Sequence, residues 1–143
     1  MRQPSGMTDL IHDHTFSRRW RIAGLALAAV MGVFQIINAV RVSVDAAGFA
    51  DYMGLPIGNG SDAFVHVYAL RSLFIGVVVL GLVAHARTGV LAWMAAVGIL
   101  LPLGDMWLTS TAGAPTAVVA RHGVIAAYLV VTAIVLTLAG RRS

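Results

Sequence analysis

Four apolar segments of about twenty residues constrain this chain more than any other feature of its sequence. They cover roughly residues 20–40, 65–84, 90–108 and 118–139. A helix of about 20 apolar residues spans the hydrocarbon core of a bilayer and satisfies all of its own backbone hydrogen bonds there. The sequence therefore predicts an all-α fold: a four-helix transmembrane bundle, formed as a single domain by residues 18–143.

Composition agrees with a membrane environment and excludes several kinds of chemistry. The 143 residues are 59% hydrophobic and 11% charged, which is too apolar for an ordinary soluble domain. There is no cysteine, so disulfides, thiol nucleophiles and cysteine-ligated metals are excluded. All ten basic residues are arginines, and most of them flank apolar segments, where they act as topology signals. We therefore expect the lipid bilayer, and no nucleic acid, as a partner.

The arginines are distributed unevenly between the two predicted sides of the membrane. Cytoplasmic segments carry an excess of basic residues, so the richer side is expected to face the cytoplasm. Both termini then lie inside, and the chain is expected to be a multi-pass protein of the inner (plasma) membrane. The predicted inner side carries Arg2, Arg18, Arg19, Arg21, Arg87, Arg141 and Arg142, and the outer side carries Arg41 and Arg121.

Residues 1–17 are polar and lack periodicity, which predicts a disordered cytoplasmic tail. The tail contains His12, Asp13 and His14, but three adjacent residues in a flexible segment do not form a closed set of metal ligands. His66, His122 and Asp105 are three further possible metal ligands, but no spacing motif supports them. We expect no metal site and no cofactor.

The connection from residue 42 to 64 is the longest in the chain. In its first half, apolar residues such as Val44, Phe49 and Met53 are interspersed with Asp45 and Asp51, which predicts a short amphipathic helix lying on the outer surface. Residues 54–60 are rich in glycine and break this helix, and Ser61 or Asp62 is placed to cap the second span. The connection is either a plain covering loop or a functional lid.

Small residues recur at every fourth position of the first span, at Gly24, Ala28 and Gly32. Such stripes allow helix backbones to approach closely in membranes. The stripe therefore predicts tight packing, either against another helix of this chain or against a second copy or another membrane partner.

Each of the four segments places polar residues toward the predicted outer side, and the inner halves consist mainly of Val, Leu, Ala, Ile and Gly. A charged side chain deep in hydrocarbon costs at least about 2.5 kcal/mol and normally pairs or faces water. Arg71 and Asp105 lie at similar depth and are expected to form an ion pair, and Pro102 is expected to bend the third span beside Asp105. The candidate binding residues are Gln35, Asn38, Arg41, His66, Tyr68, Arg121 and Tyr128, with Asp105, His122 and Arg71 as candidate catalytic residues.

Three functions remain open for this polar layer. The chain acts on a lipophilic substrate by proton transfer, as in isomerisation, cyclisation or epoxide opening, with His122 oriented by Asp105 and Arg71 holding a substrate oxygen. Alternatively, it binds an amphipathic small molecule whose acidic head meets Arg71 and Arg121. In the third interpretation the polar residues only join helices, and the chain is an accessory or scaffold subunit of a larger membrane complex.

Four short motifs carry a family resemblance. They are GFADYMGLP at residues 48–56, YALRSLFIG at 68–76, PLGD at 102–105 and RHG at 121–123. Over about residues 23–138 the chain resembles an uncharacterised family of small four-span membrane proteins, domain of unknown function 4267, with a looser likeness to DoxX-like proteins. The resemblance implies no activity. It implies that Arg71, Gly76, Asp105 and His122 occupy family-typical positions.

Overall fold

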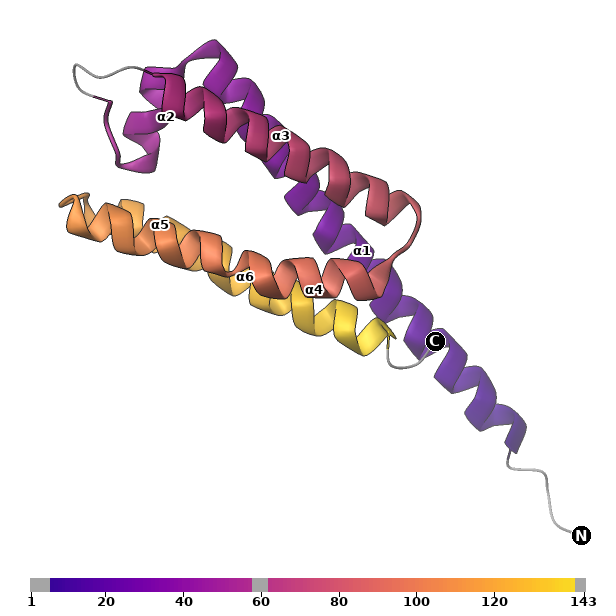
Figure 1. Cartoon of the computed structure of the whole chain (residues 1–143). Helices are drawn as coiled ribbons and strands as arrows, with labels where there is room; N and C mark the ends of the chain where they lie inside the picture. The colour runs from indigo at the N-terminus through magenta and orange to yellow at the C-terminus, as the bar shows by residue number, and fades with distance from the viewer. Residues whose placement is uncertain (1–5, 58–61, 141–143) are drawn as a thin grey trace, which may run out of the picture.

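A computed structural model of the chain describes residues 6–57 and 62–140 (Figure 1). The predicted all-α fold is confirmed, and these described residues contain no strand. The helices are α1 (Gly6–Val44), α2 (Ala46–Met53), α3 (Ala63–Ala84), α4 (Thr88–Gly98), α5 (Leu100–Thr111) and α6 (Thr116–Gly140).

Four stretches of helix are long and apolar enough to cross a membrane, as predicted. Each contains the segment expected from the sequence and extends it by a few residues. The third combines α4 and α5. The stretches are Arg18–Val44, Ala63–Ala84, Thr88–Thr111 and Thr116–Gly140. The chain is therefore a multi-pass membrane protein built as a four-helix bundle.

Helix α1 begins earlier than the sequence analysis predicted. It starts at Gly6, so the backbone of residues 6–17 is helical where a disordered tail was expected. A helix that is already nucleated gains one hydrogen bond for each residue it adds, and residues 7–19 contain no proline or glycine to stop it. Residues 1–5 and the side chains of His12, Asp13 and His14 lie outside the described part of the chain.

The third span is interrupted between α4 and α5, at Ile99. Pro102 lacks the backbone N–H that would donate to the carbonyl of Gly98, and its ring pushes that carbonyl away. Regular hydrogen bonding resumes with the Leu103 N–H, which donates to the Ile99 oxygen at 3.3 Å. Pro102 therefore interrupts the third span at Ile99, three residues before the proline. The Pro102 side chain itself is buried.

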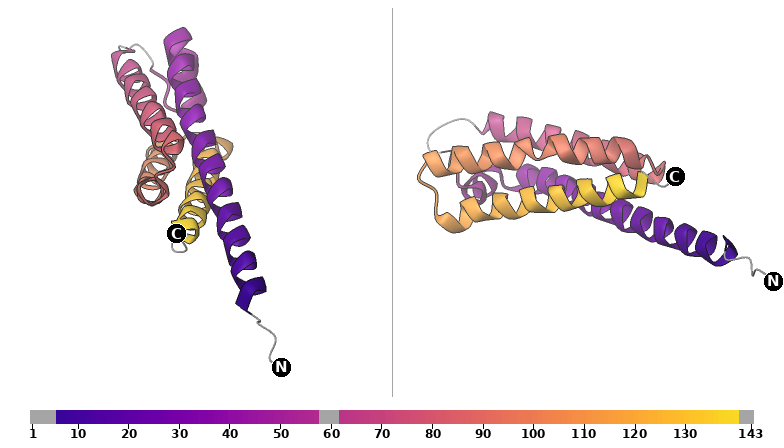
Figure 2. Two further views of the ribbon diagram at one scale, coloured as in Figure 1. Left: turned by 90° about the vertical axis from the view of Figure 1, so that its right-hand side faces the viewer. Right: turned by 90° about the horizontal axis from the view of Figure 1, so that it is seen from below.

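The helices form two groups that meet along one line of contact. α1 packs along α3, α6 packs along α4 and α5, and the contact of α1 with α6 joins the groups (Figures 1 and 2). The two groups separate toward the end that carries α2 (Figure 1). The C-terminal end of α6 lies at the opposite end, beside the α3–α4 turn.

The stripe of small residues is buried inside this chain. A Cβ atom added to Gly24 would lie 2.8 Å from Leu136 of α6, and one added to Gly32 would lie 2.9 Å from Leu80 of α3. Ala28, between them, is 4% exposed and belongs to the apolar core with Val79 and Leu136. The close neighbours of the stripe are therefore α3 and α6 of the same chain.

The predicted amphipathic helix is present as α2. The Asp45 carboxylate caps its start, because Oδ1 accepts from the Gly48 N–H at 2.8 Å. Gly54 ends it with a left-handed φ of 78°, a conformation that suits glycine. Phe49 is buried against Val42 and Ala69, so α2 is held against α1 and α3. It lies across the end where the two helix groups separate.

Candidate functional site

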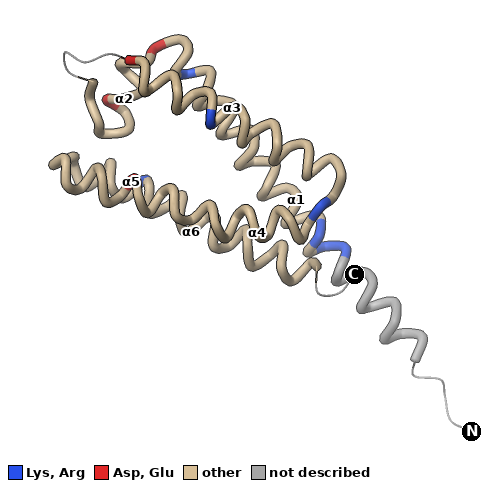
Figure 3. Tube along the Cα trace, in the orientation of Figure 1, with Lys and Arg blue, Asp and Glu red and all other residues tan. Residues whose placement is uncertain are grey.

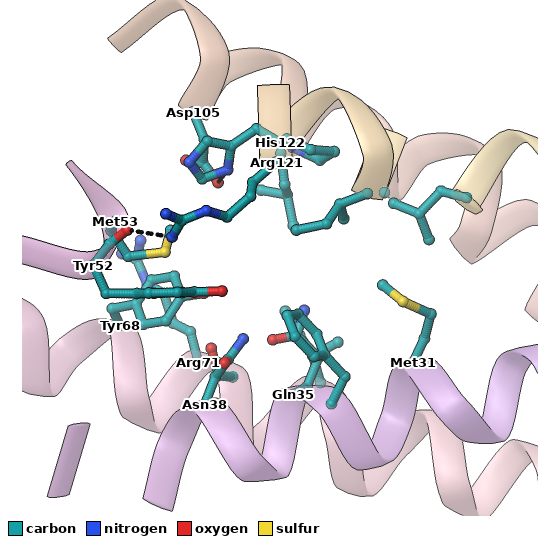
Figure 4. Close-up of a pocket in the computed structure, with 18 residues that line it drawn as sticks. Met31, Gln35, Asn38, Tyr52, Met53, Tyr68, Arg71, Asp105, Arg121 and His122 are labelled. Carbon is teal, nitrogen blue, oxygen red and sulfur yellow. Dashed lines mark hydrogen bonds and ion pairs between the residues drawn. The ribbon is translucent and has the colours of Figure 1, made fainter. Parts of the chain in front are cut away.

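A cavity of about 260 Å³ lies between the two helix groups, toward the end that carries α2 (Figure 4). All six helices contribute to its wall. We call this cavity the chamber. Its polar lining residues are Gln35, Asn38, Tyr52, Tyr68, Arg71, Ser72, Asp105, Arg121 and His122.

His122 and Asp105 form an ion pair on the wall of the chamber. His122 Nδ1 lies 3.7 Å from Asp105 Oδ2, which is longer than a hydrogen bond but close enough for a charge contact when the imidazole is protonated. The His122 side chain is 4% exposed, whereas that of Asp105 is 36% exposed. The imidazole is therefore held within the bundle, and the carboxylate presents part of its surface to the chamber.

The predicted ion pair between Arg71 and Asp105 is wrong. Asp105 pairs with His122, and Arg71 forms no ion pair with any residue that the structure describes. The prediction matched depths along the helices, but Arg71 belongs to α3 and Asp105 to α5. These helices lie in different groups and separate at this end of the bundle, so equal depth does not bring the two side chains into contact.

Two arginines hold α2 in place through Tyr52. Arg121 donates from Nη1 to the Tyr52 carbonyl oxygen at 3.1 Å, and its Cζ lies 4.4 Å from the centroid of the Tyr52 ring. The Cζ of Arg41 lies 4.4 Å from the same centroid and 5.7 Å from that of Phe49. Stacking of guanidinium groups on aromatic rings is favourable. Arg121 of α6 and Arg41 of α1 therefore both attach to α2.

Three of the predicted site residues do not line the chamber. Arg41 lies against Tyr52 and Phe49. His66 Nε2 lies 3.4 Å from the carboxylate of Asp62. The Tyr128 hydroxyl donates to the Leu27 carbonyl at 2.9 Å and so joins α6 to α1. The structure brings the other seven together, namely Gln35, Asn38, Tyr68, Arg71, Asp105, Arg121 and His122.

The capping prediction for α3 is only partly realised. Asp62 does occupy the position before the first turn, but its side chain accepts no capping hydrogen bond. Its carboxylate faces His66, four residues later. Ser61, the alternative cap, lies outside the described residues.

Two polar residues of the chamber escaped the sequence analysis. Ser72 lies one helical turn after Tyr68, so this spacing would have placed it on the same face. Tyr52 gave no such signal, because periodicity within residues 42–64 does not reveal how α2 folds back over the bundle. The structure places the Tyr52 and Met53 side chains on the wall of the chamber (Figure 4).

Two further hollows share walls with the chamber. The first, which we call the inner pocket, has a volume of about 80 Å³ and a mostly apolar lining that includes Ala28, Val79 and Leu91. Gln35 and Gly98 line both this pocket and the chamber. The second, the side opening, has a volume of about 470 Å³ between α2, α3 and α5. Its lining residues are Phe49, Ala50, Met53, Leu55, Ile57, Phe64, Val65, Tyr68 and Asp105.

Charged residues gather at both ends of the bundle and around the chamber (Figure 3). Among the described side chains, which are those of residues 18–57 and 62–140, no three His or Asp residues come together as ligands for a metal ion. The chamber instead offers guanidinium groups, amides, hydroxyls and one imidazole–carboxylate pair. These groups can hold a polar head group, and the His122–Asp105 pair can accept and donate protons.

The fold and this site define a class: a small four-span membrane protein with polar side chains collected around one internal cavity. Within that class, the chain belongs to the family described as domain of unknown function (DUF4267), whose family model matches residues 26–136. This match confirms the family resemblance. The likeness to DoxX-like proteins is not shown. Comparisons with curated proteins and with solved structures found no match.

Proposed function

We propose that this protein binds a lipophilic small molecule that carries a polar group, with the polar group in the chamber. The observation that carries the proposal is the convergence of polar side chains from five of the six helices on one cavity, to which α4 adds only Gly98. A polar residue that only joins two helices needs one partner on a neighbouring helix. A ligand site needs polar groups on several sides of one volume, set in an otherwise apolar wall.

The distribution of charge supports the same proposal. Arg71, Asp105 and Arg121 all belong to membrane-spanning stretches and all line the chamber. Ionisable residues within such stretches are rare and typically mark binding sites or pathways. We further propose that the chamber lies in the outer half of the plasma membrane, with both termini inside, because arginines are concentrated at the opposite end of the bundle.

A thermal-shift screen of the purified protein tests the proposal. The ligands are lipophilic acids, alcohols and epoxides, and one that binds only the folded state raises the midpoint of unfolding as its concentration rises. The variant Gly98→Leu fills the junction of chamber and inner pocket. A Cβ atom at Gly98 meets only Leu129, at an ordinary distance of 3.8 Å, so the start of the new side chain fits without strain. The unfolding midpoint of Gly98→Leu without ligand checks that the variant folds.

The matched control is Gly104→Leu, because Gly104 does not line the chamber and a Cβ atom there meets nothing within 4 Å. We expect the ligand-induced shift to disappear in Gly98→Leu and to persist in Gly104→Leu. A shift that persists in both variants would place binding elsewhere. No shift with any ligand would favour the alternative function, an accessory or scaffold subunit whose polar residues are structural.

A specific observation favours a second candidate function, proton transfer on the bound molecule. The buried His122 imidazole and the Asp105 carboxylate stand 3.7 Å apart beside the chamber. A carboxylate next to a histidine orients the ring, which suits general acid–base chemistry on a lipophilic substrate. Arg71 would then hold a substrate oxygen. Isomerisation, cyclisation and epoxide opening all fit this arrangement.

Turnover of any stabilising ligand, followed by mass spectrometry, separates an enzyme from a binder. If the protein is an enzyme, His122→Gln is expected to lower the turnover rate by about a hundred-fold or more, while the ligand still raises the unfolding midpoint. Ser43→Ala, at an exposed serine outside the chamber, serves as the control for handling and folding. An unchanged turnover in His122→Gln would exclude the proton-transfer role.

A further inference from the structure

We infer that the ligand is a medium-chain carboxylic acid with a hydroxyl group on its chain, bound with its carboxylate near Arg71 and Arg121 and its chain in the inner pocket. This inference rests on the proposed function and specifies its ligand. It follows from the charge of the chamber, from one polar atom without a partner, and from the size and position of the inner pocket.

The charge of the chamber favours an anionic head group. Two arginines and one aspartate line it, so its formal charge is +2 − 1 = +1 with neutral His122. Asp105 is already paired with His122, and Arg121 uses one of its five donors on the Tyr52 carbonyl. Arg71 has no hydrogen bond or ion pair to any residue in the described part of the chain. A carboxylate would give Arg71 a partner of the kind that guanidinium groups prefer.

One buried atom calls for a second polar group farther along the ligand. Gln35 Oε1 is buried and has no hydrogen-bond partner among the residues that the structure describes. Buried acceptors are normally satisfied, and a hydroxyl supplies the missing donor. Gln35 lines both the chamber and the inner pocket, so it stands where a ligand passes from one to the other. The hydroxyl therefore belongs on the chain, close to the head group.

The inner pocket sets the length of the chain. A cavity of about 10–15 Å³ holds one water molecule. A methylene group is of similar size, so a pocket of about 80 Å³ has room for roughly five to eight methylene groups. Three of its lining residues, Ala28, Val79 and Leu91, belong to the packed apolar core. About three or four further carbons cross the chamber, so the whole ligand has roughly eight to twelve carbons.

The side opening gives such a molecule a route from the membrane. Most of its wall is apolar, and Met53, Tyr68 and Asp105 are shared with the chamber. Phe64, at the start of α3, is 84% exposed at this opening. A single-chain acid can therefore pass between α3 and α5, chain first, and leave its head at the end of the chamber nearest α2.

Equilibrium binding of radiolabelled probes to the protein in lipid nanodiscs tests the inference, with empty nanodiscs as background. Four probes with one chain length vary the head: 3-hydroxydecanoate, decanoate, decanol and decyltrimethylammonium. We expect affinity to fall in that order. A second series, hexanoate, decanoate and hexadecanoate, varies the chain. We expect decanoate to bind best, because the shorter chain leaves the pocket partly empty and the longer one exceeds it.

Two variants assign these preferences to single residues. Arg71→Gln is expected to weaken decanoate binding at least about ten-fold and to leave decanol unchanged, because it removes only the charged hydrogen bond. Arg19→Gln, on the exposed face of α1 outside the chamber, should change neither. Gln35→Leu should remove the preference for 3-hydroxydecanoate over decanoate.

The outcomes separate this inference from the proposed function. If the cationic probe or decanol binds as tightly as decanoate, the inferred acid is wrong, and the binding function stands. If Gln35→Leu keeps the preference for the hydroxyl, the role of Gln35 is wrong. If hexadecanoate binds as tightly as decanoate, the inner pocket does not hold the chain. If no probe binds here and no ligand shifts the unfolding midpoint, the inference and the proposed function both fail.

Discussion

At the scale of single residues, Tyr52 connects the amphipathic helix to the rest of the bundle. Its ring lies 4.4 Å from the guanidinium carbons of both Arg41 and Arg121. A cation at the face of an aromatic ring contributes about 0.5–1 kcal/mol at exposed sites, so the two contacts together contribute roughly 1–2 kcal/mol to the docking of α2. They keep α2 over the chamber.

Tyr52→Leu should therefore loosen α2, and Tyr52→Phe should not, because phenylalanine keeps the ring. Hydrogen exchange of the α2 amides measures this opening directly. We expect exchange in the leucine variant to be about five- to thirty-fold faster than in the original protein, which corresponds to roughly 1–2 kcal/mol. Equal acceleration in both variants would show that the hydroxyl, and not the ring, holds the helix.

The charged residues of the chamber give a second prediction at this scale. A double-mutant cycle isolates the energy with which two side chains interact. We expect clear coupling, roughly 0.5 kcal/mol or more, between Asp105→Asn and His122→Gln, because these side chains form an ion pair. Coupling between Asp105→Asn and Arg71→Gln should be smaller. The reverse order, measured by unfolding in detergent, would restore the Arg71–Asp105 pair expected from the sequence.

The sequence predicted much of the chamber because membrane depth can be read from position along a helix. Gln35, Asn38, Tyr68 and His122 were grouped by depth alone, and the structure has them around one cavity. Depth does not give the rotation of a helix or the gap between helices. The Tyr128 hydroxyl therefore points to α1 instead of the chamber, and Arg71 does not reach Asp105.

At the scale of helices, the approach of α1 to α3 depends on Gly76. A Cβ atom there would lie 2.8 Å from the Gly32 carbonyl oxygen and 2.7 Å from Ile36 Cγ1. The carbonyl belongs to the backbone and cannot turn aside. Gly76→Ala should therefore destabilise the bundle by about 1–3 kcal/mol, measured by unfolding in detergent.

Gly81→Ala is the matched control, because Gly81 lies in the same helix and a Cβ atom there meets nothing within 4 Å. Alanine is favoured over glycine inside a helix by roughly 0.5–1 kcal/mol, so this variant should be neutral or slightly stabilising. A loss of stability as large as that of Gly76→Ala would contradict the role given to the contact with α1, because Gly81 makes no such contact.

The helices themselves were largely predictable, because a bilayer leaves few alternatives to a long apolar helix. The start of α1 was not predictable in this way. The polar composition of residues 1–17 indicated a tail, but polar residues do not prevent a helix from continuing once it has formed. Pro102 predicted a distortion of the third span. The distortion is a break at Ile99, because the Gly98 carbonyl loses its helical hydrogen bond to residue 102.

At the scale of the whole molecule, the chamber exists because the two helix groups are in contact at one end and separate at the other (Figure 1). α2 covers the separated end, and the apolar core of Ala28, Val79, Leu91 and Leu136 closes the other. No single span encodes this arrangement. It depends on how the pairs pack, which is why the four spans could be predicted without the cavity between them.

The proposed function requires that solutes can reach the chamber from outside the bundle. The chain has no cysteine, so single-cysteine variants can be labelled without background. Gln35→Cys places a thiol on the chamber wall, and Ala39→Cys, one turn further along α1, places one in the packed core, where Ala39 is 5% exposed.

A charged, membrane-impermeant thiol reagent added outside intact cells makes the measurement. We predict that Gln35→Cys reacts, that decanoate slows the reaction, and that Ala39→Cys stays unlabelled until the protein is denatured. A Gln35→Cys thiol that reacts from neither side of the membrane, yet reacts fully after denaturation, would contradict the account.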